Sequence, residues 1–536
     1  MKLSRLGVDK ATVRADAKAA VVLGVESVPD GLASGLLAGI NPVAGLYAYM
    51  FGVTSAAFAT STTFMAVQGT GAMAIIVADV DIDSFDDPTG ALVTLSLLTG
   101  VVMVAAGYLG AGAILRFVPN AVMAGFISAV GINIVLGQLG DFTAYDSEAA
   151  NRLGRAFDVV FHFWRVDVPT VVVGTVTIIL ILILRRTRLG AMGLVVAIVT
   201  GSVLAAIFNG LDQDISLVGD VADVPNRLPA PTMPRLADLS ALAVPAFSLA
   251  FVGLVQGAGV SASFANPDGS QSDSSQDFVG QGVGNIVAGA FQGMPVGGSM
   301  SASSLTVSAG ARSRLALVFT GGVMAIVILV FAGLVERIAM PALAGLLIVV
   351  GVETVKPHDL VTVYKTGVVQ STVMPVTLVL TLLIPLQFAV LVGVGISIIL
   401  YIVRQSNQLT TRRLLVDPDG RIKETDPPAE VGAADVIVLQ PYGSLFFAAA
   451  RMFQDQLPTV DDTSTGSVVI LRFRGKPDLG STLIDVLERY ATSLQEVGSK
   501  LVIVTNSDRI LDQLSVTGAA DVIGQENLYR GDAWLS

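Results

Sequence analysis

Long apolar runs alternate with short polar connections from about residue 17 to residue 404. A transmembrane helix needs about 20 mostly apolar residues. On that measure we expect segments near residues 17–38, 42–61, 67–80, 91–115, 121–139, 168–184, 191–208, 242–264, 278–291, 301–308, 315–334, 338–352, 368–384 and 386–403. A polar, Pro-rich stretch over 211–240 divides them into two groups of seven. The pattern predicts a polytopic α-helical membrane protein in a seven-plus-seven arrangement.

The third segment of each group is short and interrupted by glycine. The second of these lies in the stretch 292–314, QGMPVGGSMSASSLTVSAGARSR. A continuous lipid-facing helix does not fit this stretch, because loose backbone would lack hydrogen-bond partners in hydrocarbon. Broken segments occur at membrane depth where they line a cavity, and the N-terminus of a half-helix there binds anions. A loop of small residues also fits the stretch, but the matching segment at 67–80 favours a half-helix.

Composition supports this class and excludes others. The chain has 53% hydrophobic and 14% charged residues, whereas a soluble domain carries about 25% charged residues. It has no cysteine, and its two histidines, His162 and His358, lie far apart. A zinc site is therefore not expected. The net charge of -11 disfavours nucleic acid, and no G-x-x-x-x-G-K-[ST] phosphate loop indicates a nucleotide-hydrolysing pump. We expect no enzymatic activity, no metal and no cofactor.

Positive residues near the segment ends indicate the orientation in the membrane. They are Arg116, Arg185, Arg186, Arg188, Arg312, Arg314, Arg404, Arg412 and Arg413. All of them lie on one side if the N-terminus is cytoplasmic, as positively charged loops tend to be. The acidic stretch 79–87 and the stretch 211–240 then face outward. We expect a multi-pass protein of the plasma membrane with both termini in the cytoplasm.

The composition changes after Arg413. Strand-like runs at 436–439, 467–473 and 501–504 alternate with helix-like runs at 446–457, 482–497 and 509–514. They predict a small α/β domain of about 100 residues, which is large enough for a core of its own. The expected organisation is an N-terminal segment over 1–16, a transporter domain over 17–404, a linker over 405–432 and the α/β domain over 433–536.

Three ordered stretches resemble the SulP anion permeases, also called solute carrier family twenty-six. The first is Val28–Tyr47, which ends in P-x-x-G-L-Y; the second is Gly280–Asn285; the third joins Gly298–Ser301 to Ala309–Arg312. The C-terminal region is similar to the STAS domain of that family. The resemblance implies an inverted repeat of fourteen segments, a core domain that moves against a gate domain, and a homodimer in the lipid bilayer. It also implies a substrate site between the third and tenth segments.

Two half-helix N-termini at one cavity would present free N–H groups and positive dipole ends to a small anion. The expected substrate-binding residues are Gln68, Gly69, Thr70, Gly71, Ala72, Ser301, Ala302, Ser303 and Ser304. Hydroxyl groups would complete the shell without net charge. The alternative role of these small residues is close helix packing.

The sequence departs from the family pattern at three positions. Relatives often carry Arg where this chain has Ala302, a carboxylate where it has Gln256, and Gln where it has Asp30. Glu26 lies four residues before Asp30, on the same helical face, and neighbouring carboxylates disfavour each other's charge. An ionisable group inside a span indicates function. Our hypothesis is that Asp30, together with Glu26, replaces the acid missing at Gln256 in proton coupling. The alternative is a local hydrogen bond of Asp30 beside Pro29.

These features predict secondary active transport of a small inorganic anion, with a proton or sodium ion as co-substrate. Sulfate comes first and bicarbonate second, since the missing Arg weakens the case for a divalent anion. An uncoupled channel or exchanger is the main alternative, favoured by Gln256 and disfavoured by Asp30. A C4-dicarboxylate transporter and a membrane-tethered sensor are the others.

Several polar residues have more modest expected roles. Asn133, Gln138 and Asn285 are expected to bond between helices rather than to touch substrate. In the C-terminal region, Gly480 stands where related STAS domains carry a phosphorylated Ser, so no phosphorylation is expected. Ser481 is expected to be a helix N-cap.

Overall fold

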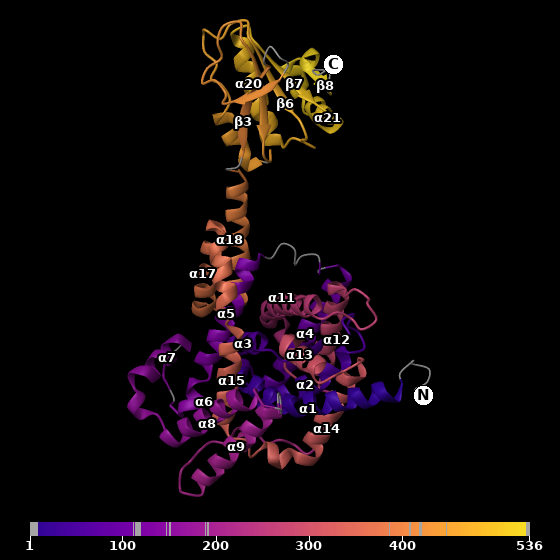
Figure 1. The fold of residues 1–536 in the computed structure, drawn as a ribbon, viewed down its shortest axis with the longest axis vertical. Helices are drawn as coiled ribbons and strands as arrows, with labels where there is room; N and C mark the ends of the chain where they lie inside the picture. The colour runs from indigo at the N-terminus through magenta and orange to yellow at the C-terminus, as the bar shows by residue number, and fades with distance from the viewer. Residues whose placement is uncertain are drawn as a thin grey trace. The chain divides into compact units, whose positions relative to one another are not determined.

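The computed structural model describes residues 9–110, 112, 119–145, 147–149, 152–187, 189, 192–384, 386–406, 409–416, 421–445 and 447–531. Arg116, Arg188 and the side chain of Arg404, which support the expected orientation, lie outside this description. The chain divides into two compact units, Met1–Val394 and Gly395–Ser536, with the division inside one helix. The first unit is helical and the second is built on a β-sheet (Figure 1).

A helix is present at every expected segment. Their bounds are α1 (Lys10–Leu37), α2 (Pro42–Ala56), α3 (Gly71–Val80), α4 (Pro88–Tyr108), α5 (Asn120–Gly137), α8 (Val168–Leu184), α9 (Met192–Asn209), α11 (Leu239–Ser263), α12 (Ser274–Ala290), α13 (Met300–Ser308), α14 (Leu315–Val335), α15 (Met340–Thr354), α17 (Val368–Leu383) and α18 (Leu386–Ser406). Short helices α6 (Leu139–Thr143), α7 (Arg152–Phe161), α10 (Val218–Val221) and α16 (Pro357–Thr366) connect them. Within the described residues, seven helices are long and apolar enough to cross a membrane by themselves.

Several helices begin where the sequence places a capping side chain before a proline. Asn41 Oδ1 accepts a hydrogen bond from the Val43 N–H over 2.9 Å at the start of α2. Asp87 and Asp167 cap α4 and α8 in the same way. Proline in the first turn lacks only a donor that the helix leaves unpaired. These starts were therefore readable from the sequence.

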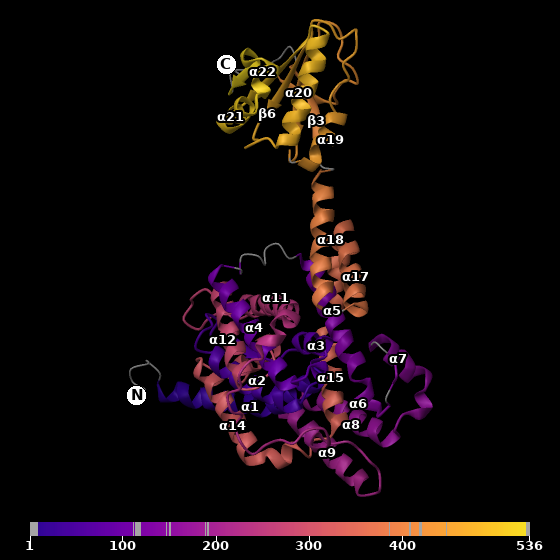
Figure 2. The same cartoon turned by 180° about the vertical axis from the view of Figure 1, so that it is seen from behind.

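The packing of the helical unit follows the inverted repeat. In the core, α12 packs on α4 and α14 packs on α2, while α1 packs on α14 and α11 packs on α4. Exchanging the two halves of the repeat converts the α12–α4 pair into the α2–α14 pair. It likewise converts the α1–α14 pair into the α11–α4 pair. In the gate, α5 packs on α17 and α8 packs on α15, which are exchanged likewise. The views in Figures 1 and 2 show α2, α4 and α12 grouped apart from α6, α8 and α9. The seven-plus-seven fold is confirmed.

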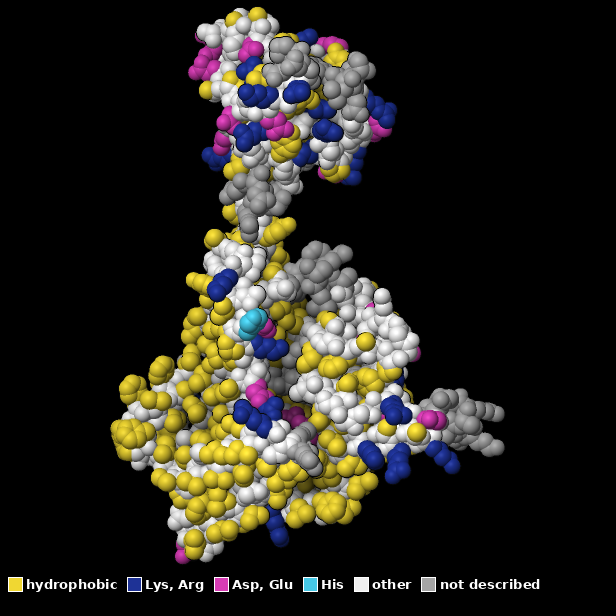
Figure 3. Space-filling model, viewed as in Figure 1, with side chains coloured by type: hydrophobic (Ala, Val, Ile, Leu, Met, Phe, Trp, Pro, Cys, Tyr) yellow, Lys and Arg dark blue, Asp and Glu magenta, His cyan; other side chains and the backbone are white. Residues whose placement is uncertain are grey.

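Large apolar side chains are exposed on the outer faces of the gate helices. Ile179 and Ile183 of α8 and Val203 and Ile207 of α9 are about half exposed. Figure 3 shows hydrophobic side chains covering this part of the helical unit. Apolar surface of this extent marks a membrane or protein contact. It agrees with helices that face lipid.

The C-terminal unit holds a six-stranded sheet in the order β4-β3-β5-β6-β7-β8. The strands are β3 (Thr410–Val416), β4 (Ile422–Thr425), β5 (Val436–Tyr442), β6 (Val468–Phe473), β7 (Lys500–Thr505) and β8 (Leu528–Arg530). Strands β5 to β8 are parallel, and β3 is antiparallel to both β4 and β5. Helices α19 (Ala450–Asp455), α20 (Ser481–Glu496), α21 (Asp508–Thr517) and α22 (Ala519–Ile523) complete the unit.

Two features of this unit differ from the sequence-based expectation. Residues 410–416 and 422–425, which fall in the expected linker, form β3 and β4 of the sheet. Their charge is typical of strands near a sheet edge, where it discourages pairing with other chains. The expected N-cap at Ser481 is wrong, because α20 begins at Ser481 and its cap position is Gly480, with no side-chain bond.

Candidate functional site

A two-stranded sheet joins the two interrupted segments. Strand β1 (Ala66–Gln68) pairs antiparallel with β2 (Gly297–Ser299), with Ala66 opposite Ser299 and Gln68 opposite Gly297. Helix α3 begins at Gly71, shortly after β1 ends at Gln68, and α13 begins directly after β2. One short backbone ladder therefore holds the starts of both half-helices. The half-helix interpretation of these segments is confirmed, and the loop alternative is wrong.

A side chain caps the start of each half-helix and satisfies only part of its first turn. Thr70 is the N-cap of α3 and its Oγ1 accepts from the Met73 N–H over 3.4 Å. Ser299 is the N-cap of α13 and its Oγ accepts from the Ala302 N–H over 3.3 Å. The N–H groups in a first helical turn have no partner within the helix, and each cap satisfies one. Among the described residues, the first two N–H groups of each helix, on 71–72 of α3 and on 300–301 of α13, have no hydrogen-bond partner.

The four serines around the start of α13 have different surroundings. Ser303 is fully buried; its Oγ donates to the Ser299 carbonyl over 2.6 Å and accepts from the Ala66 N–H over 3.0 Å. It thereby fastens α13 to β1, which is the packing role of a small residue. Ser301 and Ser304 are exposed, and the Ser301 hydroxyl lies 3.2 Å from that of Ser299. Of the expected serine ligands, these two have accessible hydroxyls.

Ala302 points away from the free donors. Its side chain is 4% exposed and packs in an apolar cluster with Leu23, Val53 and Leu317. This cluster joins α13 to α1, α2 and α14. The methyl group fits the cluster, whereas a guanidinium group would be surrounded there by hydrocarbon. The helix start thus carries no fixed cation at this position.

Gln256 of α11 is joined to the start of α3. Thr70 Oγ1 donates to Gln256 Oε1 over 3.0 Å. The hydrogen bonds described for Gln256 use only its carbonyl oxygen, so its NH₂ group keeps the capacity to donate. A carboxylate could only accept at this place when ionised. The amide therefore adds a donor beside the half-helix rather than a negative charge.

Amides of α12 hold the approach to β2, and sequence reasoning missed one of them. Gln281 Oε1 accepts from the Gly298 N–H over 2.9 Å. Asn285 brackets Val296, accepting from its N–H over 2.9 Å and donating to its carbonyl over 2.6 Å. The sequence does contain a signal for Gln281, since it lies one helical turn before Asn285 on a glycine-rich face of α12. Asn285 also donates to Met103 Sδ of α4 over 3.3 Å, and Asn133 donates to the Thr381 carbonyl of α17 over 3.0 Å, so both bond between helices as expected.

Gln68 lies behind the site. Its side chain is 1% exposed, and its Nε2 donates to the Ser27 hydroxyl of α1 over 2.8 Å. Its Oε1 is buried and has no hydrogen-bond partner within the described residues, as is true of Gln138 Oε1. Gln68 thus connects β1 to α1, the helix that carries the two intramembrane acids.

Asp30 is connected to the turn before α3. Asp30 and Glu26 are both partly buried on α1. The Tyr49 hydroxyl of α2 donates to Asp30 Oδ2 over 2.8 Å and also lies 2.8 Å from the Gly69 carbonyl and 2.9 Å from Ser34 Oγ. The alternative role of Asp30 required a local hydrogen bond beside Pro29. The bond that Asp30 accepts instead comes from Tyr49 on another helix. Sequence reasoning missed Tyr49, because its contacts with Asp30 and Gly69 join residues that are about 20 positions apart.

Two further buried carboxylates were also missed, and both fix the segments around the half-helices. Asp277 of α12 is 1% exposed and accepts from the Ser61 and Thr62 N–H groups over 2.6 and 2.8 Å. Asp16 of α1 is fully buried and accepts from the Arg312 N–H over 2.6 Å. The first holds the entry to β1, and the second holds the exit from α13. Each is a lone acid near a helix start, which the sequence alone does not distinguish from a cap.

A separate cavity of about 220 Å³ lies beside the turn between α1 and α2. Its lining includes Asn41, Tyr47, Asp83 and Asp223, and none of the expected site residues. Its carboxylates make it a poor place for an anion. Within the described residues, no group of three or more His, Asp or Glu side chains could hold a metal ion.

Comparisons with known proteins agree with this geometry. A family model described as Sulfate permease family matches residues 13–377, and a STAS domain model matches residues 427–531. The chain is 24% identical to Probable sulfate transporter 4.2 of Arabidopsis thaliana, over 95% of this chain and 79% of that protein. It is 25% identical to the Bicarbonate transporter BicA of Synechocystis sp., over 91% of this chain and 86% of that protein. The structure of murine Solute Carrier 26 family member A9 in the inward-facing state matches with a TM-score of 0.82 at 17% identity, covering 98% of this chain and 91% of that one.

Proposed function

The chain belongs to the sulfate permease family, and on that premise we propose that it is a proton-coupled secondary active transporter of a small inorganic anion, sulfate first. The observation that carries the proposal is the pair of half-helix starts held by β1 and β2, with free N–H groups on 71–72 and 300–301. Backbone donors at helix N-termini bind oxyanions without a fixed cation. Weak, reversible binding of this kind suits transport.

The acids of α1 supply the coupling in this proposal. Asp30 and Glu26 lie one helical turn apart, and Asp30 is linked through Tyr49 to the residue before Thr70. Ionised carboxylates near an anion raise its free energy, because like charges repel strongly in a poorly solvated site. A proton on one of these acids removes that repulsion. Proton and anion therefore bind best together, which is the requirement for symport.

Alternating access follows from the two groups of helices. The half-helices and α1 belong to the core group, and their described neighbours in the gate group are α5 for α3, and α15 and α9 for α1. Movement of the core against these gate helices would expose the half-helix starts to one side and then to the other.

Bicarbonate transport is the second candidate. The observation that favours it is the apolar packing of Ala302, which leaves dipoles and hydroxyl groups but no fixed cation at the start of α13. A monovalent anion depends less on such a cation than a divalent one. The similarity to BicA agrees with this candidate but does not distinguish it from sulfate.

The test is an uptake panel in proteoliposomes. Labelled sulfate, bicarbonate, chloride and fumarate are offered with and without inward proton and sodium gradients. We expect sulfate uptake that rises with the inward proton gradient and does not respond to sodium. Flux that follows the gradient of the anion alone, with neither proton nor sodium dependence, would instead establish a channel or exchanger. Fumarate uptake without sulfate uptake would establish a C4-dicarboxylate transporter, and saturable binding without uptake would establish a sensor.

We also propose that the protein is a homodimer of the plasma membrane with the N-terminus and STAS domain in the cytoplasm. The chain has no cysteine, so single introduced cysteines report without background. Ser84→Cys lies in the acidic connection after α3 and Ser493→Cys lies in α20, both at exposed positions. In intact cells, an impermeant maleimide should label Ser84→Cys and not Ser493→Cys. The reverse labelling would contradict the orientation.

A further inference from the structure

The Tyr49 hydroxyl has one proton and three polar neighbours. Asp30 Oδ2 and the Gly69 carbonyl oxygen each lie 2.8 Å from it, and Ser34 Oγ lies 2.9 Å from it. A phenol donates one hydrogen bond, a backbone carbonyl only accepts, and a carboxyl group donates only when it is protonated. Tyr49 therefore cannot donate to Asp30 and to Gly69 at the same time.

The protonation state of Asp30 decides between two arrangements. When Asp30 is ionised, the phenol donates to it, because a bond to a charged acceptor is the stronger one. The Gly69 carbonyl then loses this donor. When Asp30 is protonated, its hydroxyl can donate to the Tyr49 oxygen, and the phenol is free to donate to Gly69. The carbonyl directly before the Thr70 cap is therefore held by Tyr49 only when Asp30 carries a proton.

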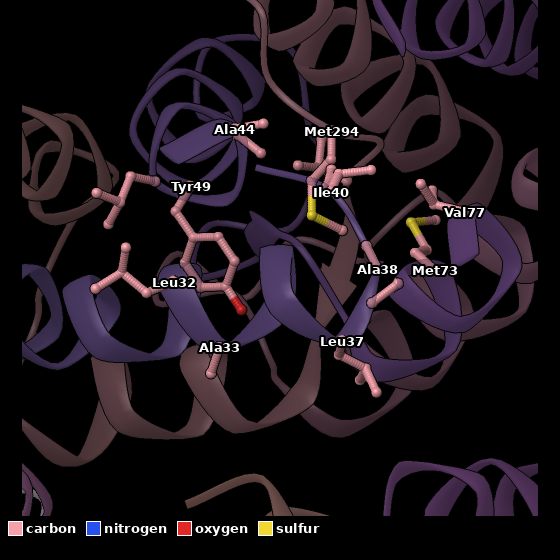
Figure 4. Close-up of a cluster of buried hydrophobic side chains, with 14 of the residues drawn as sticks. Leu32, Ala33, Leu37, Ala38, Ile40, Ala44, Tyr49, Met73, Val77 and Met294 are labelled. Carbon is pink, nitrogen blue, oxygen red and sulfur yellow. The ribbon is translucent and has the colours of Figure 1, made fainter. Parts of the chain in front are cut away.

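Packing keeps Tyr49 in place for both arrangements. The side chain is 1% exposed, and Figure 4 shows its ring beside Leu32 and Ala33 of α1. A Cβ atom on Gly69 would lie 2.8 Å from the ring atom Cε2 of Tyr49. The backbone at 69 thus rests directly against the ring, and there is no space for a larger residue. A change in the hydrogen bonding of Tyr49 is consequently passed to this backbone rather than absorbed by a loose side chain.

Few titratable groups other than Tyr49 lie near Asp30 among the described residues. Glu26 is its neighbour on α1. Among the described elements packed against α1, helices α9, α13 and α14 contain no Asp, Glu, Lys, Arg, His or Tyr. Asp79 of α3 is paired with Arg152, and Glu353 of α15 is paired with Arg185. On α2, Tyr47 lines the separate acidic cavity. The titratable neighbours left to Asp30 are Glu26 and Tyr49.

From this geometry we propose that Tyr49 is a positioning residue for transport, which links the protonation of Asp30 to the conformation of the α3 anion site through the Gly69 carbonyl. The inference rests on the proposed proton-coupled function and adds the connection between its two sites. The coupling is reciprocal: an anion that orders residues 69–72 favours the proton on Asp30, and the proton favours the anion. It predicts that anion affinity rises as the pH falls.

The test measures sulfate binding to the purified full-length protein between pH 5 and pH 8, the experimental range chosen to bracket carboxyl titration in a buried site. We expect the wild type to bind more tightly at the acid end, by roughly 3- to 10-fold, which corresponds to one hydrogen bond. Tyr49→Phe keeps the ring and removes the hydroxyl, so its affinity should rise less between neutral and acid pH than that of the wild type, because only the direct charge repulsion by the carboxylates is left. Asp30→Asn should show the tight affinity at every pH, because its NH₂ group can donate to Tyr49. The double variant should bind more weakly than Asp30→Asn, because the introduced amide then has no phenol through which to act on Gly69.

Tyr47→Phe is the matched control, since it removes a phenol from the same helix outside this network, and it should keep the wild-type pH profile. Tyr49→Phe with a weakened affinity but an unchanged ratio between acid and neutral pH would show a merely structural role and overturn the inference. If Tyr49→Phe does not fold, Asp30→Asn still tests the inference. Weak sulfate affinity of Asp30→Asn at every pH would overturn the inference. If uptake by the wild-type protein does not depend on the proton gradient, the proposed proton-coupled function is wrong, whatever the variants show.

Discussion

The side chains of Thr70 and Gln256 meet over 3.0 Å, although the two residues are 186 positions apart in the sequence. The bond ties the N-cap of α3 to α11, so both halves of the repeat contribute to the α3 side of the proposed anion site. It also fixes the Gln256 carbonyl toward Thr70, which leaves the amide NH₂ group as a donor. A change at residue 256 should therefore act directly on the proposed anion site.

Gln256→Glu should convert this donor into a negative charge. We expect anion affinity at neutral pH to fall roughly 10- to 100-fold, as for a like charge within several ångströms in a partly desolvated site. The loss should recover at acid pH, where the new carboxyl group takes up a proton. Isothermal titration of the purified protein with sulfate at two pH values checks this. Gln213→Glu, the same change in an exposed connection, is the control; an equal loss in both variants would contradict the role of residue 256.

Ala302→Arg should damage folding rather than restore a cation to the site. The side chain at 302 is 4% exposed among apolar residues, and an unpaired buried charge costs about 3–5 kcal/mol. We expect a lower thermal midpoint and less monodisperse protein by size-exclusion chromatography. Ser301→Arg places the same group at an exposed position beside the free N–H donors, and it should keep its stability and bind sulfate more tightly. A stable Ala302→Arg protein with raised sulfate affinity would refute this placement.

Ser303→Ala should destabilise the link between α13 and β1. The change removes the acceptor of the Ala66 N–H and leaves that buried group without its partner. Such a loss costs about 1–3 kcal/mol of folding free energy. Ser304→Ala, one residue further at an exposed position, should leave the thermal midpoint near the wild-type value. Equal midpoints for the two variants would show that the Ser303 bonds carry no stability.

Asp277→Ala should destabilise the protein more than Asp273→Ala does. Asp277 is buried and accepts from two backbone N–H groups in the turn before β1, as well as from the Ser261 hydroxyl. Asp273 only caps the start of α12, a contribution of about 1 kcal/mol. Thermal unfolding of the two variants side by side measures the difference. The opposite order would show that the turn at 61–62 is held by other contacts.

Much of this architecture was readable in the sequence because it depends on local composition. The length of each apolar run limits where a helix can cross a membrane, and the glycines and serines of 67–72 and 297–304 mark the two places where a continuous helix cannot form. Asn41, Asp87 and Asp167 before proline mark helix starts in the same local way. Charged residues hid β4, which is the edge strand of its sheet, and β3, which lies next to it, because strands in such positions need not show the apolar alternation of central ones.

The sequence by itself thus determined the class of the protein, its fourteen segments and the two broken helices. Only the tertiary structure decided which side chains serve the site. Ser303 and Ser304 are adjacent and chemically identical, yet one is buried against Ala66 and the other is exposed. Their difference comes from the β1–β2 register, which sets the rotation of α13, and Tyr49 acquires its role because α2 carries it to Asp30 and Gly69. Such contacts join residues distant in sequence, so no local pattern encodes them.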